Sequence, residues 1–181
     1  DTHVQPRVAL LVTGNELVSP GTILKAGQIY DSNTHALKAA LRQLGIASIK
    51  ARRSGDRPAA LRRGLDSAFR RADAVITVGG ISMGDYDYVK AAAEDLGVQT
   101  VFWRVAIKPG MPNYFGLWRP GEGASSKPLF GLPGNPVSAL VSFHQLVRPA
   151  LLRMAGRRDA QGRTMPAVLA ATCRKKTGRL E

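Results

Sequence analysis

Residues 8–16 read VALLVTGNE and give the first indication of the fold. Their opening part, residues 8–12, is a continuous apolar run, and a run without polar alternation is typical of a strand that is buried on both faces. The run ends in the polar segment Thr13-Gly14-Asn15. Strands of this kind occur mainly in parallel sheets that helices cover, so this stretch predicts an α/β domain.

The rest of the chain alternates between apolar runs and segments with helical periodicity. The first helix is expected to begin after a cap at residues 32–34, to run to about residue 44 and to end at Gly45. Further helices are expected over residues 58–71, 88–96 and 136–154. Further strands are expected over residues 46–51, 74–78, 100–107, 114–118, 129–131 and 165–173. The pattern predicts a three-layer α/β/α fold with a largely parallel sheet, followed by a truncated β segment.

The same pattern predicts how the chain divides into domains. We expect an α/β domain over residues 1–156, and a linker followed by one lone strand over residues 157–181. The chain begins at Asp1 and not at a methionine, so we expect it to be part of a longer protein.

Composition excludes several classes of protein. The 181 residues are 44% hydrophobic and 22% charged, an ordinary globular mixture that is long enough for one domain. No apolar run approaches the roughly 18 residues of a membrane span, and no secretory leader is visible. The single cysteine, Cys173, cannot form an internal disulfide. We therefore expect a cytoplasmic protein with no membrane partner.

The chain is strongly basic, because 26 Lys and Arg residues outnumber 13 Asp and Glu and leave a net charge of +13. Much of the excess lies in arginine pairs at residues 52–53, 62–63, 70–71 and 157–158. No aromatic residues alternate with these pairs, and no nucleic-acid recognition motif accompanies them. The charge therefore favours an anionic ligand or partner over specific binding of nucleic acid.

The segment Gly131-Leu132-Pro133-Gly134-Asn135-Pro136-Val137-Ser138 marks the start of a helix. Asn135 suits the cap position and Pro136 suits the first helical position, where its missing N–H costs nothing. The glycines would let the backbone approach a ligand, and the free N–H groups of Val137 and Ser138 would then form an anion cradle. A capped helix start needs no ligand, however, and the spacing alone supports both interpretations equally.

A second glycine-rich segment, residues 79–88, follows the predicted strand 74–78. Gly79 and Gly80 permit a backbone conformation whose N–H groups suit phosphate or another oxyanion. Ser82 and two carboxylates, Asp85 and Asp87, would lie beside them, which suits Mg²⁺ bridging a carboxylate and a phosphate. The alternative is a turn in which one of these aspartates caps the next helix.

Acidic residues also follow the first two predicted strands. Glu16 comes after the first and Asp56 after the second, and together with Asp87 they would place three carboxylates at one sheet edge. Single acidic residues in loops are usually solvated or capping, but three at one edge of a basic protein suggest a site for a hard cation.

The segment Lys108-Pro109-Gly110 begins with a cation, and a second cation, Arg104, lies four residues before it. Alternation along the expected strand 100–107 places Arg104 and Lys108 on one face, where both could contact one anion. The alternative is an edge strand that its charges keep soluble.

Two other kinds of site are disfavoured. His3, His35 and His144 form no pair with the spacing of zinc ligands. Neither Ser82 nor Ser138 has a histidine base beside it, which argues against a serine hydrolase.

Five motifs occur here in the order found in one enzyme family. They are TGNEL at residues 13–17, YDSN at 30–33, GGISMG at 79–84 followed by Asp87 and Tyr88, KPG at 108–110, and GLPGNPVS at 131–138. The chain resembles the molybdopterin molybdenumtransferase (MoeA) family, which includes the gephyrin E domain. The resemblance covers about residues 7–155, and the tail from about residue 163 is similar to the start of that family's C-terminal β domain.

The resemblance implies a reaction in molybdenum cofactor biosynthesis. Adenylated molybdopterin binds, molybdate is inserted at its dithiolene, and the adenylate is cleaved to release AMP. Mg²⁺ is the implied cofactor, and the implied partners are a second copy of the full-length protein and a molybdopterin adenylyltransferase. A stand-alone pterin-binding or adenylyltransferase module shares the fold and is the alternative, although the motifs at 108–110 and 132–136 look more like the transferase.

The resemblance also assigns roles to residues. Those implied in catalysis are Glu16, Asp56, Asp87 and Lys108, with Asp56 and Asp87 as metal ligands. Those implied in substrate binding are Gly79, Gly80, Ser82, Gly84, Arg104, Pro133, Gly134, Asn135, Pro136 and Ser138. Arg104 and Met111 stand where some members have lysine, and the family's N-terminal domains have no counterpart here. We therefore expect this chain to fold and bind ligand but to turn over poorly by itself.

Overall fold

A computed structural model gives the fold and describes residues 4–80, 88–162, 164–168 and 170–172. Its centre is a six-stranded sheet with the strand order β4-β1-β5-β8-β7-β6. The strands are β1 (Val8–Thr13), β4 (Ile49–Ser54), β5 (Ala74–Val78), β6 (Gln99–Trp103), β7 (Tyr114–Trp118) and β8 (Lys127–Leu132). β4, β1, β5 and β8 run parallel, whereas β7 pairs antiparallel with both β8 and β6. The prediction of a largely parallel α/β sheet is confirmed.

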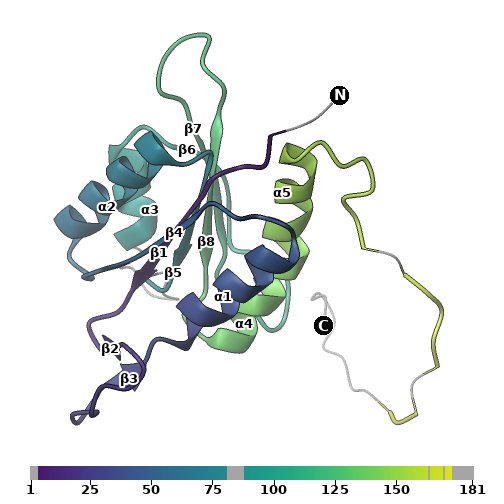
Figure 1. The fold of residues 1–181 in the computed structure, drawn as a ribbon, viewed down its shortest axis with the longest axis horizontal. Helices are drawn as coiled ribbons and strands as arrows, with labels where there is room; N and C mark the ends of the chain where they lie inside the picture. Colours follow the sequence, from purple (N-terminus) through teal and green to yellow (C-terminus); the bar gives the residue numbers. More distant parts are fainter. Residues whose placement is uncertain (1–3, 81–87, 163, 169, 173–181) are drawn as a thin grey trace.

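Helices cover both faces of this sheet, as the three-layer prediction requires (Figure 1). One core joins the sheet to α1 (Ser32–Gln43), α4 (Pro136–Ser142), the π-helical segment η1 (Phe143–Val147) and α5 (Arg148–Met154). The opposite core joins it to α2 (Pro58–Arg71) and α3 (Tyr88–Asp95). β1 and β5 are buried over their whole length because they lie between the two layers.

The helix ends follow from local chemistry. Asp31 caps α1, since its side chain accepts a hydrogen bond from the N–H of Thr34, so the cap lies one residue before the predicted segment. Gly45 ends the helix with φ of +83°, a conformation that suits glycine. The predicted helix 136–154 forms as α4, η1 and α5 in succession. The π segment ends just before Pro149, whose ring would clash with the carbonyl of Gln145 in a regular α-helix.

Several predicted strands differ from the structure, and β8, for example, spans Lys127–Leu132 and is longer than the predicted 129–131. β4 begins at Ile49 and extends to Ser54, later than the predicted 46–51, and β6 ends at Trp103 and not at residue 107. The strand predicted over residues 165–173 is wrong for the residues described there, 165–168 and 170–172, which have no regular secondary structure. A lone segment of this kind has no neighbouring strand with which to exchange backbone hydrogen bonds. The domain division at residue 156 stays a prediction.

The topology places the ends of four parallel strands at one edge of the sheet. β4, β1, β5 and β8 are neighbours in the sheet, so the polar loops that follow them begin at the same edge. A small separate sheet of β2 (Leu17–Val18) and β3 (Ile29–Tyr30) follows β1. None of the helices in the described part of the chain could cross a membrane.

Candidate functional site

A cavity of about 690 Å³ opens at this edge of the sheet. It lies where β1, β4 and β5 end and where α1 and α4 begin, the usual location of a ligand site in an open α/β sheet. Seven of the predicted site residues line it: Glu16, Asp56, Gly79, Gly80, Gly134, Asn135 and Pro136. Thr13, Gly14, Asn33, Tyr30 and Tyr88 are among the other lining residues. The convergence of loops predicted from the sequence is therefore confirmed for the described residues.

The backbone of Gly79 and Gly80 approaches the end of β1 closely. Both residues have positive φ, +81° and +68°. A Cβ at Gly79 would lie 2.6 Å from the carbonyl oxygen of Thr13, and one at Gly80 would lie 3.0 Å from the Thr13 hydroxyl. No other residue fits either position without displacing backbone or side-chain atoms, so the glycines build a narrow loop with its main chain toward the cavity.

Asn135 acts as the N-cap of α4, as predicted. Its side-chain oxygen accepts hydrogen bonds from the N–H groups of Val137 and Ser138, at N···O distances of 3.1 and 3.4 Å. Of the two interpretations that the spacing left open, the structure therefore supports the capped helix start, because the cap already accepts hydrogen bonds from the N–H groups that an anion cradle would need. Pro136 occupies the first helical turn and lines the cavity with Asn135.

The two described carboxylates of the site have different surroundings. Asp56 accepts a hydrogen bond from the N–H of Asn15, with an N···O distance of 2.9 Å, and so connects the loop after β4 to the loop after β1. Glu16 is exposed and lies close to Gly14. The described residues contain no group of three or more His, Cys, Asp or Glu that could hold a metal. Asp87, the third predicted carboxylate, lies outside the described residues.

Asn33 is a site residue that reasoning from spacing alone did not single out. Its side chain is 7% exposed and donates a hydrogen bond from Nδ2 to the carbonyl of Gly134, 2.8 Å away, which joins α1 to the loop before α4. Its Oδ1 is buried and has no hydrogen-bond partner among the described residues. A buried acceptor without a partner costs roughly 1–3 kcal/mol, so this atom is suited to accept a hydrogen bond from a ligand. The YDSN motif at residues 30–33 was its one signal in the sequence.

Four predicted residues are absent from the cavity lining. Pro133 is buried just before Gly134, and Ser138 is half-buried in the first turn of α4. Arg104 and Lys108 are exposed and follow β6. The loop that carries them packs on α4 through Asn113, whose Nδ2 lies 2.9 Å from the hydroxyl of Ser142.

The prediction that strand alternation aligns Arg104 with Lys108 is wrong. β6 ends at Trp103, and Arg104 has a φ of +71°, so the backbone turns there and alternation stops. The N–H of Arg104 donates to the carbonyl of Asn113 at 2.7 Å, and its guanidinium lies 4.2 Å from the centre of the Trp103 ring. Ser82, Gly84, Asp85 and Asp87 lie outside the described residues, as do His3 and Cys173.

Comparison with known proteins adds independent information. The family described as "Probable molybdopterin binding domain" matches residues 9–153. The chain is 40% identical to the molybdopterin molybdenumtransferase of Haemophilus influenzae over 180 residues, which are 98% of this chain and 42% of that protein. It is 41% identical to molybdopterin molybdenumtransferase 2 of Mycobacterium tuberculosis, again covering 42% of the relative.

A solved structure has the same fold. The molybdopterin biosynthesis protein MoeA of Pyrococcus horikoshii superposes with a TM-score of 0.73 and 36% sequence identity, covering 87% of this chain and 37% of its own. The chain thus spans well under half the length of these relatives.

Proposed function

The chain belongs to the family of molybdopterin-binding domains, and from this premise we propose that its edge cavity binds adenylated molybdopterin. We further propose that, in the intact protein, this domain serves the insertion of molybdate into the pterin with cleavage of the adenylate and release of AMP. The names of the relatives support the assignment to molybdenum cofactor biosynthesis.

One observation carries the binding proposal: Asn33 lines a cavity that glycines also line, and its buried Oδ1 has no hydrogen-bond partner among the described residues. A pterin presents ring N–H groups, and a buried amide oxygen is a suitable acceptor for one of them. The main chain at Gly79 and Gly80 has no side chains to hold a phosphate away. The walls at Leu17 and Tyr88 supply apolar and aromatic surface beside these polar groups.

The residues present fit a divalent cation such as Mg²⁺. Mg²⁺ is commonly held by one or two carboxylates together with phosphate oxygens of the substrate. Glu16 and Asp56 both line the cavity, and we propose that they hold the cation, with Asp87 as a further ligand. When bound, the cation would supply charge stabilisation at the phosphate bond that is cleaved. The hydrogen bond from the Asn15 N–H to one carboxylate oxygen of Asp56 fixes the position of this side chain beside the cation.

We propose that the cations that follow β6 position the second substrate. Lys108 and Arg104 are both exposed on the loop between β6 and β7, and cationic side chains of this kind suit an oxyanion such as molybdate. The intact protein is proposed to act as a homodimer, to receive adenylated pterin from an adenylyltransferase, and to work in the cytoplasm.

A binding titration tests the proposal. Adenylated molybdopterin is titrated into the wild-type chain with Mg²⁺ present, and into Asn33→Ala and the control Thr77→Ala. Thr77 is also a buried polar residue, but it lies within β5 and outside the cavity lining. We expect Asn33→Ala to weaken binding by about tenfold or more, because the ligand loses a buried hydrogen bond, and Thr77→Ala to bind as the wild type does.

Product analysis then separates the transferase from its alternative. AMP release that requires both molybdate and Mg²⁺ supports the transferase, whereas consumption of ATP with unmodified pterin supports an adenylyltransferase. Equal loss of binding in both variants, or no pterin binding by the wild type, contradicts the binding proposal. Turnover by this chain equal to that of an intact relative would contradict the expectation that it turns over poorly alone.

A further inference from the structure

β4 is unusual among the parallel strands of this fold. Parallel sheets normally have both faces covered, and β1 and β5 are accordingly buried throughout. β4 lies at the edge, and its six residues are all exposed or half-buried. β1 is the only described strand that pairs with it. Alternate backbone N–H and C=O groups of β4 therefore point away from the sheet without a strand to receive them.

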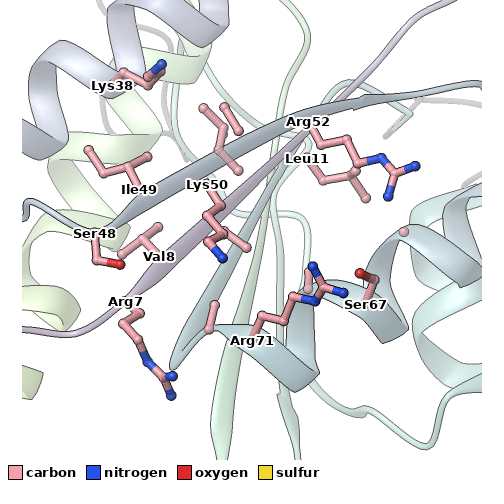
Figure 2. Close-up of a pocket in the computed structure, with 16 residues that line it drawn as sticks. Arg7, Val8, Leu11, Lys38, Ser48, Ile49, Lys50, Arg52, Ser67 and Arg71 are labelled. Carbon is pink, nitrogen blue, oxygen red and sulfur yellow. The ribbon is translucent and has the colours of Figure 1, made fainter.

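A second cavity, of about 480 Å³, lies beside this strand and shares no residue with the cavity at the strand ends. Lys50 and Arg52 of β4 line it together with Arg71 of α2, and no acidic side chain does. Figure 2 shows Lys50 and Arg71 reaching into the space between β4 and α2. Ala9 and Leu11 of β1 form its apolar floor.

The cations of this cavity are not explained by ion pairs within the fold. Arg7, at its rim, pairs with Asp73 at 2.7 Å. Lys50, Arg52 and Arg71 form no ion pair within residues 4–80, 88–162, 164–168 and 170–172. Like charges gathered from β4 and α2 repel one another, so their convergence costs stability. Charges that only keep an edge strand soluble would not need a matching cation on the neighbouring helix.

The charge and backbone groups of β4 and of the cavity beside it favour one class of binding partner over others. A second copy paired through β4 would bring Lys50, Arg52 and Arg53 against the same residues of its partner, and like charges directly opposite are destabilising. A nucleic acid matches the charge but uses neither the apolar floor nor the outward backbone groups. An extended acidic peptide uses both the charge and the backbone groups, because its backbone pairs with β4 and its carboxylates meet Lys50 and Arg52 on the α2 face. Its alternate side chains point to the other face, where Ile49 and Ala51 of β4 lie.

We propose that β4 and this cavity bind an extended acidic segment of another polypeptide, which adds to the sheet as a seventh strand beyond β4. Its carboxylates on the α2 face contact Lys50, Arg52 and Arg71. Its alternate apolar side chains lie on the opposite face of the sheet, beside Ile49 and Ala51 of β4. The proposed peptide site is separate from the cavity at the strand ends, since the two have no lining residue in common.

Peptide binding tests the proposal on the whole chain. The probe is a fluorescein-labelled peptide of about eight residues with alternating Glu and Val, a length that suits pairing with a strand. Two further peptides share its length: one has prolines in place of two central valines, and the other has Lys in place of Glu. The third control probe is a single-stranded oligonucleotide of equal charge. Fluorescence anisotropy at low salt gives each affinity.

The protein variants are matched in charge. The double variant Lys50→Glu with Arg71→Glu changes two exposed cations of the cavity, and Lys25→Glu with Arg158→Glu changes two exposed cations elsewhere. We expect the cavity variant to weaken binding of the Glu–Val peptide by about tenfold or more and the control to change it by less than about twofold. The proline peptide should bind at least about tenfold more weakly, because proline cannot donate to a strand.

A second measurement does not depend on the variants. With saturating Glu–Val peptide, amide hydrogen exchange of the wild-type chain should slow in residues 49–54. The proposal is overturned if the Glu–Val peptide fails to bind, if the proline peptide or the oligonucleotide binds as tightly, or if exchange in β4 is unchanged. It is equally overturned if both double variants lose the same affinity.

Discussion

Replacing Gly79 by alanine tests the geometry of the loop that follows β5. The residue has a φ of +81°, and an added Cβ would lie 2.6 Å from the carbonyl oxygen of Thr13. Two costs therefore combine. A non-glycine residue in this conformation costs about 1–2 kcal/mol. Forcing a methyl group against fixed backbone costs about 1–3 kcal/mol more.

Gly97 provides a control that carries the first cost alone. It follows α3 with a φ of +76°, and a Cβ there would meet nothing within 4 Å. We therefore expect Gly97→Ala to lower the free energy of unfolding by about 1–2 kcal/mol and Gly79→Ala by about 2–5 kcal/mol. The difference between the two variants isolates the contact with Thr13.

Urea denaturation at neutral pH measures both variants. With an m-value of about 2 kcal/mol per molar urea, the cost of the methyl contact with Thr13 places the urea midpoint of Gly79→Ala roughly 0.5–1.5 M below that of Gly97→Ala. Equal midpoints would show that the loop relaxes without cost, and the inference of a closely packed main chain beside the cavity would then fail.

Two further predictions concern single hydrogen-bonding groups. Asn135→Ala should lower the free energy of unfolding by about 1 kcal/mol, because α4 loses its cap. Asn135→Asp keeps the acceptor and should stay near the wild type in urea denaturation. Equal losses of stability in both variants would contradict the capping role. The hydrogen bond from Arg7 lowers the pKa of Asp73, so this carboxylate contributes stability that is complete at neutral pH and is lost as the pH falls through its lowered pKa. Asp73→Asn should accordingly be less stable than the wild type at pH 7 and approach it below about pH 4, and a difference that persists unchanged into acid would refute this.

The interior of the sheet was predictable and its edges were not. β5 forms over the predicted residues, and β1 over the predicted run plus Thr13, because a strand buried on both faces has to be apolar at every position. β4 carries the sequence IKARRS, in which exposure removes the apolar pattern, so its bounds were misplaced. β6 ends at Trp103, where the backbone turns at Arg104 with a φ of +71°, a conformation that is uncommon for arginine and that no local pattern predicts.

The candidate site, too, has residues that the sequence could predict and residues that it could not. Glycines after a buried strand and a capped proline-started helix are local signals, and both lead to residues that line the cavity. The role of Asn33 depends on Gly134, which lies 101 residues later in the chain, so spacing could not reveal it. The bond from the Asn15 N–H to Asp56 is a long-range contact of the same kind, and it gives that carboxylate a structural role beside any chemical one.

The distribution of charge explains why net charge alone could not locate a ligand. A charge of +13 attracts anions to the whole molecule and speeds their arrival without selecting a place. The described lining of the cavity at the strand ends nevertheless includes two carboxylates, Glu16 and Asp56, whereas the cavity beside β4 is lined by cations and no acid. A phosphate ligand can enter the first only if a cation offsets those carboxylates, while an acidic peptide meets no such obstacle at the second. The basic composition thus matches the cavity beside β4 directly, and it would match the cavity at the strand ends only through a bound cation.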